Sequence, residues 1–293
     1  MSINSTNRIN IEKISKNNAS YQKFEVLLTN KNKRYKYNEF MVEGVRNINE
    51  AINNNWKINS FIYSYEKKLS KWAFDILHNI KTDINYELSE RLMTELSGKE
   101  NTSELIAIIK MKSNIDMEIE VERKIERDKK FSENPVIALF DRPSNKGNLG
   151  TILRSCDAFG VEKLIITGHS VDIYEPDVIG ASMGSFFKIP FMRFSDNADI
   201  DNYITGLKQT YPLLKVIGTT AHDKTNIYEI DMTTPVLFLI GNEADGLNKH
   251  YLEISDFLAT IPMSEQSSAS SFNVSCAATV IFYEAFRQRG KIL

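Results

Sequence analysis

The chain has 293 residues, 42% of them hydrophobic and 25% charged, and its formal net charge is -2. This composition is typical of a globular protein and excludes an intrinsically disordered chain, and the length predicts two domains. The sequence has neither the ~20-residue apolar run of a membrane-spanning helix nor an apolar segment typical of a signal peptide. Its two cysteines, Cys156 and Cys276, are too few and too distant for a disulfide framework or a cysteine-based zinc site. We therefore expect a cytoplasmic protein without membrane contacts.

The first half of the chain, residues 1–112, is predicted to be a small mixed α/β domain. Apolar residues recur at helical spacing over 39–55, which predicts an amphipathic helix. The short apolar runs at 60–64 and 104–111 are typical of strands.

Basic side chains are in excess in the first 130 residues. Residues 1–130 hold 23 Lys and Arg against 19 Asp and Glu, whereas the remainder holds 13 and 19. The excess includes the run KNKRYK, in which a tyrosine stands among four cations. Such a run can neutralise phosphates and stack a base, although a solvated surface turn would have the same composition. The candidate nucleic-acid contacts are Lys31, Lys33, Arg34 and Lys36.

A highly charged segment over 113–134 separates the two halves and ends at a proline. Because Pro135 disfavours helix at the residue before it, we interpret this segment as a linker that is helical in part.

The second half, residues 135–293, is predicted to be a parallel α/β sheet. Short, continuous apolar runs alternate with helical stretches, as expected for strands that are buried on both faces, and a buried helix closes the chain at 272–288. Ligands of such sheets bind at the carboxyl ends of the strands, so the loops that follow the strands are the candidate sites. The predicted strands are 135–140, 163–167, 214–219, 235–240 and 257–261.

Several common sites are missing from this half and from the rest of the sequence. There is no G-x-G spacing for a dinucleotide, which argues against a dehydrogenase, and no P-loop or G-x-S-x-G elbow. The four histidines are scattered without the spacing of metal ligands, so we expect no metal.

Three polar, glycine-bearing loops remain as candidates for chemistry. The first, over 141–161, places Asn145, Asn148 and Arg154 at the start of a predicted helix, where an arginine is also commonly a surface ion pair. The second, GNEADG at 241–246, follows a strand, and a glycine there would let a flat ligand lie against the backbone. A plain turn would explain the same residues equally well.

The third loop, over 261–278, leads into the closing helix. Ser271 or Asn273 could cap that helix, which would explain a polar residue there without any catalytic role. The three loops are far more specific together than any one of them alone.

Their content and order resemble the three signature motifs of the SpoU/TrmH-type RNA ribose 2′-O-methyltransferases of the SPOUT superfamily. The first motif corresponds to NKGNLGTILRSCDAFG (145–160), the second to LIGNEADGL (239–247), and the third to IPM (261–263) followed by SFNVSCAA (271–278). The stretch over 176–191 also resembles the segment between these motifs. The N-terminal stretch KRYKYNEFMVEGVRNINEAI (33–52) resembles the L30e-like RNA-binding domain that some members carry.

The resemblance implies a C-terminal parallel α/β sheet with a deep trefoil knot, S-adenosyl-L-methionine as cofactor, and a homodimer. It implies a polar catalytic set of Asn145, Arg154, Glu243, Ser271 and Asn273. It implies cofactor contacts from Thr219, Gly241, Asn242, Ile261, Met263 and Phe272. Phe272 stands where the family usually has leucine, and the loop over 264–270 is longer than usual.

The implied reaction transfers a methyl group from a sulfonium to a ribose 2′-hydroxyl. The residue that corresponds to Arg154 is often assigned as the base in this family. A guanidinium has a pKa above ~12 and rarely gives up its proton, so binding an RNA phosphate is the alternative role of Arg154. We expect ribosomal RNA as substrate. The alternatives are tRNA, or a non-catalytic RNA-binding or ribosome-assembly factor of the same fold.

Overall fold

The computed structural model describes residues 10–99, 102–119, 133–221 and 225–290. These residues form two compact units, which are described separately. The first unit is Met1–Met111 with Tyr174–Gly180, and the second is Lys112–Ile173 with Ala181–Leu293. Most of the predicted linker lies outside the described residues; its described beginning is helical over 114–119.

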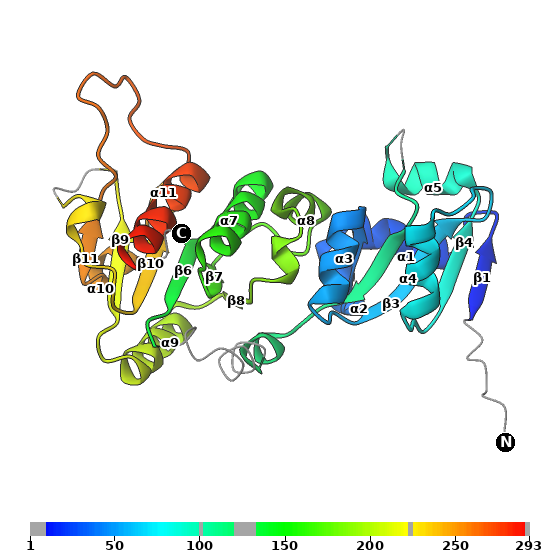
Figure 1. Cartoon of the computed structure of the whole chain (residues 1–293), viewed down its shortest axis with the longest axis horizontal. Coiled ribbons are helices and arrows are strands. Elements are labelled where there is room, and N and C mark those ends of the chain that lie inside the picture. The colour runs from blue at the N-terminus through cyan, green and yellow to red at the C-terminus, as the bar shows by residue number, and fades with distance from the viewer. Residues whose placement is uncertain (1–9, 100–101, 120–132, 222–224, 291–293) are drawn as a thin grey trace. The chain divides into compact units, whose positions relative to one another are not determined.

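The first unit is built on a mixed sheet, which has five strands among the described residues, in the order β1-β4-β3-β5-β2 (Figure 1). Strands β1, β4 and β3 are parallel, and β5 runs antiparallel to both β3 and β2. The strands are β1 (Ile11–Ile14), β2 (Glu39–Glu43), β3 (Ile58–Ser64), β4 (Asn85–Leu88) and β5 (Ile106–Lys110). The helices are α1 (Ala19–Thr29), α2 (Lys31–Tyr37), α3 (Val45–Asn53), α4 (Lys71–Asn79) and α5 (Glu90–Ser97).

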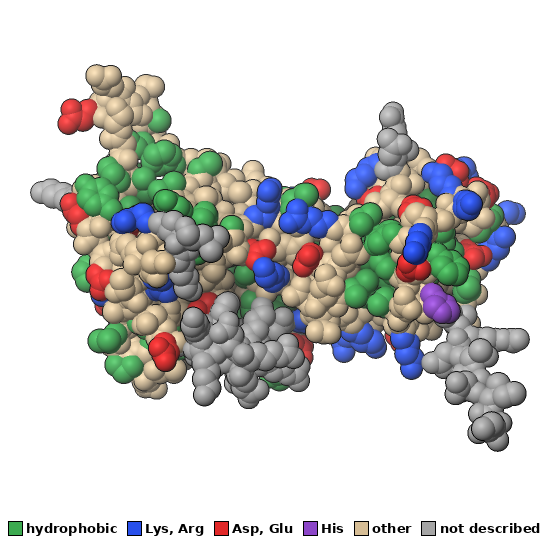
Figure 2. Space-filling model, in the orientation of Figure 1, with side chains coloured by type: hydrophobic (Ala, Val, Ile, Leu, Met, Phe, Trp, Pro, Cys, Tyr) green, Lys and Arg blue, Asp and Glu red, His purple; other side chains and the backbone are tan. Residues whose placement is uncertain are grey.

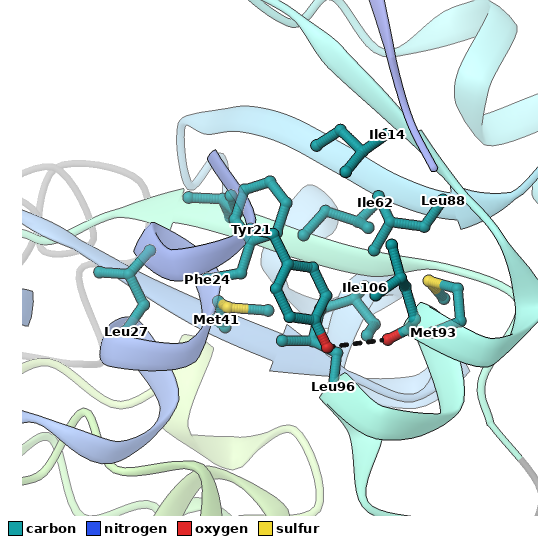
Figure 3. Close-up of a cluster of buried hydrophobic side chains, with 12 residues drawn as sticks. Ile14, Tyr21, Phe24, Leu27, Met41, Ile62, Leu88, Met93, Leu96 and Ile106 are labelled. Atoms are coloured by element: carbon teal, nitrogen blue, oxygen red, sulfur yellow. Dashed lines mark hydrogen bonds between the residues drawn. The ribbon is translucent and has the colours of Figure 1, made fainter. Parts of the chain in front are cut away.

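A buried cluster joins α1 and α5 to this sheet (Figure 3). Tyr21 and Phe24 from α1 pack with Met93 and Leu96 from α5 over side chains of the strands. The Tyr21 hydroxyl donates a hydrogen bond to the Leu92 carbonyl at 3.2 Å, so this buried polar group is satisfied.

The predicted helix over 39–55 is wrong in its first part. Residues Glu39–Glu43 form strand β2, paired antiparallel with β5, and α3 begins only at Val45. The helical spacing over the whole stretch hid three consecutive apolar residues, 40–42, which are all buried although β2 is at the edge of the sheet. The predicted strands over 60–64 and 104–111 are confirmed as β3 and β5.

The basic run at 31–36 is helix α2, and it does not present all its cations to solvent. Arg34 is only 2% exposed, and its Nη1 donates to the carbonyls of Leu27 and Leu28, both at 3.0 Å. These carbonyls belong to the last turn of α1, where a cation satisfies groups that lack an intrahelical partner. Arg34 therefore does not face solvent, whereas Lys33 is half-buried and Lys36 is exposed. The nucleic-acid contacts expected of this run stay a prediction.

The second unit is built on a parallel sheet, with six strands among the described residues, in the order β11-β9-β10-β6-β7-β8. The strands are β6 (Val136–Asp141), β7 (Lys163–Thr167), β8 (Phe191–Phe194), β9 (Lys215–Thr219), β10 (Val236–Ile240) and β11 (Phe257–Ala259). The helices are α7 (Lys146–Phe159), α9 (Asn197–Thr210), α10 (Lys249–Ile254) and α11 (Val274–Gln288). Helix α8 (Pro176–Ser182) is divided between the units, because its residues up to Gly180 belong to the first unit and the rest to the second.

Helices cover both faces of this sheet, which explains why its strands are continuously apolar. Leu237 and Leu239 of β10 belong to a buried cluster with α9 and α10, whereas Phe238 between them packs against Phe282 of α11. Helix α7 lies beside α11 on that second face (Figure 1).

The five strands predicted in this half are confirmed to within a few residues. The short edge strand β8 was missed because Phe191–Phe194 includes the half-buried Arg193 and lacks a continuous apolar run. The trefoil knot stays a prediction. No helix within the described ranges is long and apolar enough to cross a membrane.

Candidate active site

A cavity of about 660 Å³ opens at the carboxyl ends of β9, β10 and β11. This volume falls in the range of about 300–1,000 Å³ that is usual for small-molecule sites. Most of its lining comes from four segments of the chain, 219–221, 240–247, 259–263 and 270–274, and the remainder is Ile227, Leu252, Ala277 and Ile281. The second and third of the three sequence motifs thus supply most of one cavity.

The loop after β10 closes on itself through its own backbone. The Asn242 amide donates to the Gly246 carbonyl at 3.1 Å, and the Asn242 side-chain oxygen accepts from the amides of Ala244 and Asp245 at 2.9 and 2.7 Å. A Cβ at Gly241 would lie 2.2 Å from backbone atoms of Gly246 and Leu247. Glycine at this position is therefore required by the closure of the loop, whether or not a ligand approaches it.

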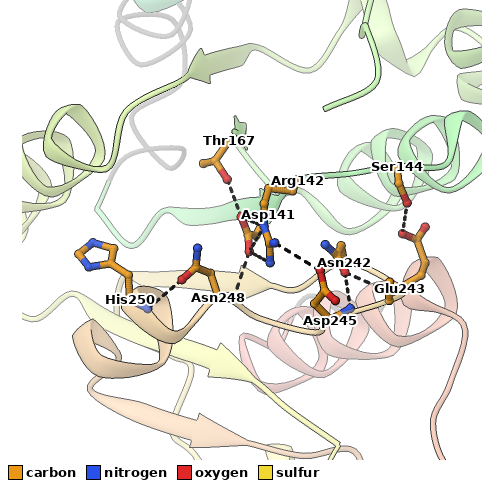
Figure 4. A network of polar contacts seen from close by, with 10 residues as sticks. Asp141, Arg142, Ser144, Thr167, Asn242, Glu243, Asp245, Asn248 and His250 are labelled. Carbon is orange, nitrogen blue, oxygen red and sulfur yellow. Dashed lines mark hydrogen bonds and ion pairs between the residues drawn. The ribbon is translucent and has the colours of Figure 1, made fainter. Parts of the chain in front are cut away.

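The three motif loops meet in a hydrogen-bonded cluster centred on Asn148. The Asn148 side-chain amide donates to Glu243, and its oxygen accepts from the amide of Asn273 at 3.2 Å. Glu243 also accepts from the Ser144 hydroxyl at 3.0 Å (Figure 4). Glu243 and Asn273 line the cavity, so this polar cluster lies at its wall.

Asn148 was not among the predicted catalytic residues, although it lies in the first motif. Asn145 was among the predicted catalytic residues. It is the N-cap of α7, and its side-chain oxygen accepts a hydrogen bond from the backbone amide of Asn148 at 3.0 Å. Asn145 does not line the cavity. The signal in the sequence was the pair of asparagines three residues apart at a helix start, where one can cap while the other projects from the first turn.

Asn273 combines two roles that the sequence left open. It is the N-cap of α11, and its oxygen accepts from the amides of Ser275 and Cys276 and from the Ser275 hydroxyl. The other face of the same side chain donates to Asn148. Capping therefore fixes the Asn273 side chain in the orientation that the cluster needs, whereas Ser271 lines the cavity without capping the helix.

Arg154 lies apart from this cluster. It is exposed on α7 and makes no hydrogen bond or ion pair with any residue in the described ranges. Six residues separate it from Asn148, which corresponds to about 9 Å along a helix. Its guanidinium is therefore free to bind an anion from solvent.

The residues proposed to contact a cofactor all line the cavity: Thr219, Gly241, Asn242, Ile261, Met263 and Phe272. The Thr219 hydroxyl donates to the Leu239 carbonyl at 2.9 Å, so it also fastens β9 to β10. Phe272 is 45% exposed, at the end of the exposed loop over 264–270 that rises from the sheet between β11 and α11 (Figure 1).

This arrangement can be compared with known proteins. The SpoU rRNA Methylase family matches residues 135–283, which include the cavity and the polar cluster, and the SpoU L30e-like domain matches residues 18–107. The chain belongs to the SpoU rRNA methylase family. The predicted family and the predicted parallel α/β sheet are therefore confirmed, without the trefoil knot, which stays a prediction.

Relatives of this SpoU methylase extend over almost its whole length. A 23S rRNA (uridine(2479)-2′-O)-methyltransferase from Streptomyces viridochromogenes is 35% identical over 94% of this chain and 92% of its own. The 23S rRNA (guanosine(2553)-2′-O)-methyltransferase RlmP of Bacillus subtilis is 26% identical over 87% of this chain and 92% of its own. The crystal structure of the SpoU methyltransferase AviRb from S. viridochromogenes in complex with AdoMet has a TM-score of 0.82, at 34% identity over 93% of this chain and 98% of that one.

Proposed function

We propose that this SpoU methylase transfers a methyl group from S-adenosyl-L-methionine to a ribose 2′-hydroxyl of 23S rRNA. The observation that carries the proposal is the convergence of three loops: one cavity of suitable volume has the Asn148–Glu243–Asn273 cluster in its wall. The full-length similarity to rRNA 2′-O-methyltransferases favours the same substrate class. An rRNA substrate also accords with a cytoplasmic location, and the methyl transfer as proposed uses no metal.

The cavity suits this cofactor in its chemistry as well as its volume. Its lining combines apolar side chains, such as Ile227, Ile240 and Leu247, with backbone groups of the loop after β10. An apolar wall with a few fixed polar groups is typical of nucleoside-sized ligands. When bound, S-adenosyl-L-methionine supplies an electrophilic methyl group on a positively charged sulfur. Glu243 belongs to the polar cluster and places a carboxylate in the cavity wall, where it would favour that charge.

The protein must hold the ribose hydroxyl in line, because a hydroxyl is a weak nucleophile unless it is oriented and relieved of its proton. We assign the orientation to hydrogen bonds from Asn273 and Ser271, which face the cavity. We assign Arg154 to an RNA phosphate, since it is exposed and has no partner within the described residues. A planar guanidinium can hold a phosphate through two parallel hydrogen bonds.

Methyl transfer from tritium-labelled S-adenosyl-L-methionine tests the function. The purified protein is incubated with 23S rRNA, 16S rRNA and tRNA. The modified nucleotide is then mapped, because the phosphodiester bond that follows a 2′-O-methylated ribose resists alkaline cleavage. We expect labelling at a ribose of 23S rRNA. Labelling of tRNA alone would favour the alternative substrate, and no transfer to any RNA would favour a non-catalytic RNA-binding factor.

The lysines of α2 are the proposed RNA-docking residues that the structure leaves accessible. Changing Lys33 and Lys36 to glutamate should weaken RNA binding. It should also reduce the slope of log K against log salt by about 0.7 for each phosphate that the protein no longer neutralises. Filter binding between 50 and 200 mM salt measures both effects. The matched control is the double change of Lys68 and Lys71 to glutamate, since both are exposed lysines of the same unit. An equal loss in the control would show that α2 is not the docking site.

We further propose that the protein is a homodimer through α11. The exposed residues Cys276, Val280 and Tyr283 are spaced four and three apart, so they form an apolar stripe on one face of the helix. Hydrophobic side chains gather in this region of the molecule (Figure 2). A stripe of this kind can pair with its own copy across a twofold axis, which is the commonest form of oligomer.

Placing a charge in this stripe should split the dimer. Tyr283→Glu is expected to be monomeric in sedimentation velocity at concentrations where the wild type is dimeric, because burying an unpaired carboxylate is costly. Tyr228→Glu is the control, since Tyr228 is also exposed, on another part of the same unit. A dimer that persists in Tyr283→Glu would place the interface elsewhere.

A further inference from the structure

The buried carboxylate of Asp141 lies next to the loop over 241–248 but does not line the cavity. Asp141 ends strand β6 and is 1% exposed. Its oxygens accept hydrogen bonds from the Thr167 hydroxyl at 3.0 Å, the Asn248 amide at 3.1 Å, and the Nε and Nη2 of Arg142 at 3.0–3.2 Å (Figure 4). A carboxylate at this depth is stable only because donors surround it.

The donors come from three different segments of the chain. Thr167 ends the neighbouring strand β7, Arg142 follows Asp141 directly, and Asn248 ends the loop that follows β10. Through its hydrogen bond with Asn248, Asp141 therefore attaches the C-terminal end of the loop over 241–248 to β6, in the middle of the sheet. The near end of that loop is continuous with β10.

Arg142 adds a second attachment to the same loop. Its Nη1 reaches Asp245 at 3.5 Å while its other nitrogens hold Asp141. Its φ is +46°, a left-handed conformation that a residue with a side chain adopts uncommonly. A Cβ at Gly168 would lie 2.8 Å from the Arg142 Cγ, so a glycine at the end of β7 leaves the space that this conformation needs.

We propose that Asp141 and Arg142 are positioning residues that hold the loop over 241–248 in its cofactor-binding shape. They thereby set the affinity for S-adenosyl-L-methionine without touching it, since neither lines the cavity. The inference rests on the proposed function only in taking S-adenosyl-L-methionine as the ligand of the cavity. The same loop carries Glu243, so its position also governs the polar cluster.

The affinity for S-adenosylhomocysteine, measured by calorimetry, tests this inference without requiring RNA. In Asp141→Asn and in Arg142→Gln we expect the dissociation constant to rise by at least about tenfold. Hydrogen exchange should become faster at the amides of 242–248 but not at those of β7. Thr167→Val is the matched control: it removes one donor to Asp141 from β7 and leaves the loop attached, so its affinity should stay within about twofold of the wild type.

The outcomes separate the inference from the proposed function. Wild-type protein that fails to bind S-adenosylhomocysteine would contradict the proposed function. Wild-type binding that is matched by folded Asp141→Asn and Arg142→Gln variants would overturn the positioning role. So would an equal loss of affinity in Thr167→Val, because the cluster would then serve the sheet in general. If Asp141→Asn does not fold, the half-exposed Arg142 provides the decisive variant.

Discussion

Replacing Arg154 with alanine is expected to reduce methyl transfer by about 10²-fold, because a ribose hydroxyl that is no longer positioned through the RNA phosphate leaves the in-line geometry. The affinity for S-adenosyl-L-methionine should stay within about twofold of the wild type. The reason is the isolation of Arg154: it does not line the cavity, and it has no hydrogen-bond or ion-pair partner among the described residues. Single-turnover kinetics with labelled cofactor and calorimetry together measure the two effects.

Lysine at the same position separates charge from geometry. Arg154→Lys keeps the positive charge but loses the planar pair of donors, so we expect it to recover RNA binding more fully than turnover. Normal turnover in Arg154→Ala would refute the role assigned to this residue. Loss of cofactor binding in a folded Arg154→Ala variant would refute it equally.

Gly241→Ala should abolish cofactor binding. The added Cβ would lie 2.2 Å from backbone atoms of Gly246 and Leu247, so the loop after β10 must open to accept it. That loop forms one wall of the cavity and carries Glu243. We expect no measurable heat of binding with S-adenosylhomocysteine, while circular dichroism keeps the signal of the folded protein.

Gly206→Ala provides the control for this change. Gly206 lies inside α9, and a Cβ there would meet no atom within 4 Å. The same substitution should therefore leave cofactor binding intact and raise stability by about 0.4–1 kcal/mol, as alanine restricts the unfolded chain. Cofactor binding retained in Gly241→Ala would show that the observed loop closure is not needed for the site.

The elements of the second unit could be predicted from the sequence because they are buried on both faces. Strand β7 has an unbroken apolar centre, Leu164–Ile166, and was predicted to the residue, whereas in β8, at the edge of the sheet, Arg193 interrupts the apolar residues and the strand was not recognised. In the first unit, helical spacing over 39–55 could not reveal that the apolar residues of β2 pair with a strand more than sixty positions later. Such pairing is a tertiary effect that local patterns do not contain.

The site was predictable as a set of loops but not as a set of contacts. The motifs predicted that Glu243 and Asn273 belong to one site, and both lie in the same hydrogen-bonded cluster. The sequence did not show that Asn145 caps α7 whereas Asn148 is hydrogen-bonded to both Glu243 and Asn273. The basic run also did not show that the Arg34 side chain is buried and donates hydrogen bonds to carbonyls of α1. These outcomes depend on which side chain finds an unsatisfied backbone group, and only the folded chain decides that.

The most direct test of the account is a crystal structure of this protein with S-adenosylhomocysteine. We expect the ligand in the cavity at the carboxyl ends of β9, β10 and β11, with its sulfur on the side of the Asn148–Glu243–Asn273 cluster. A ligand bound elsewhere, or with its sulfur turned away from that cluster, would contradict the account.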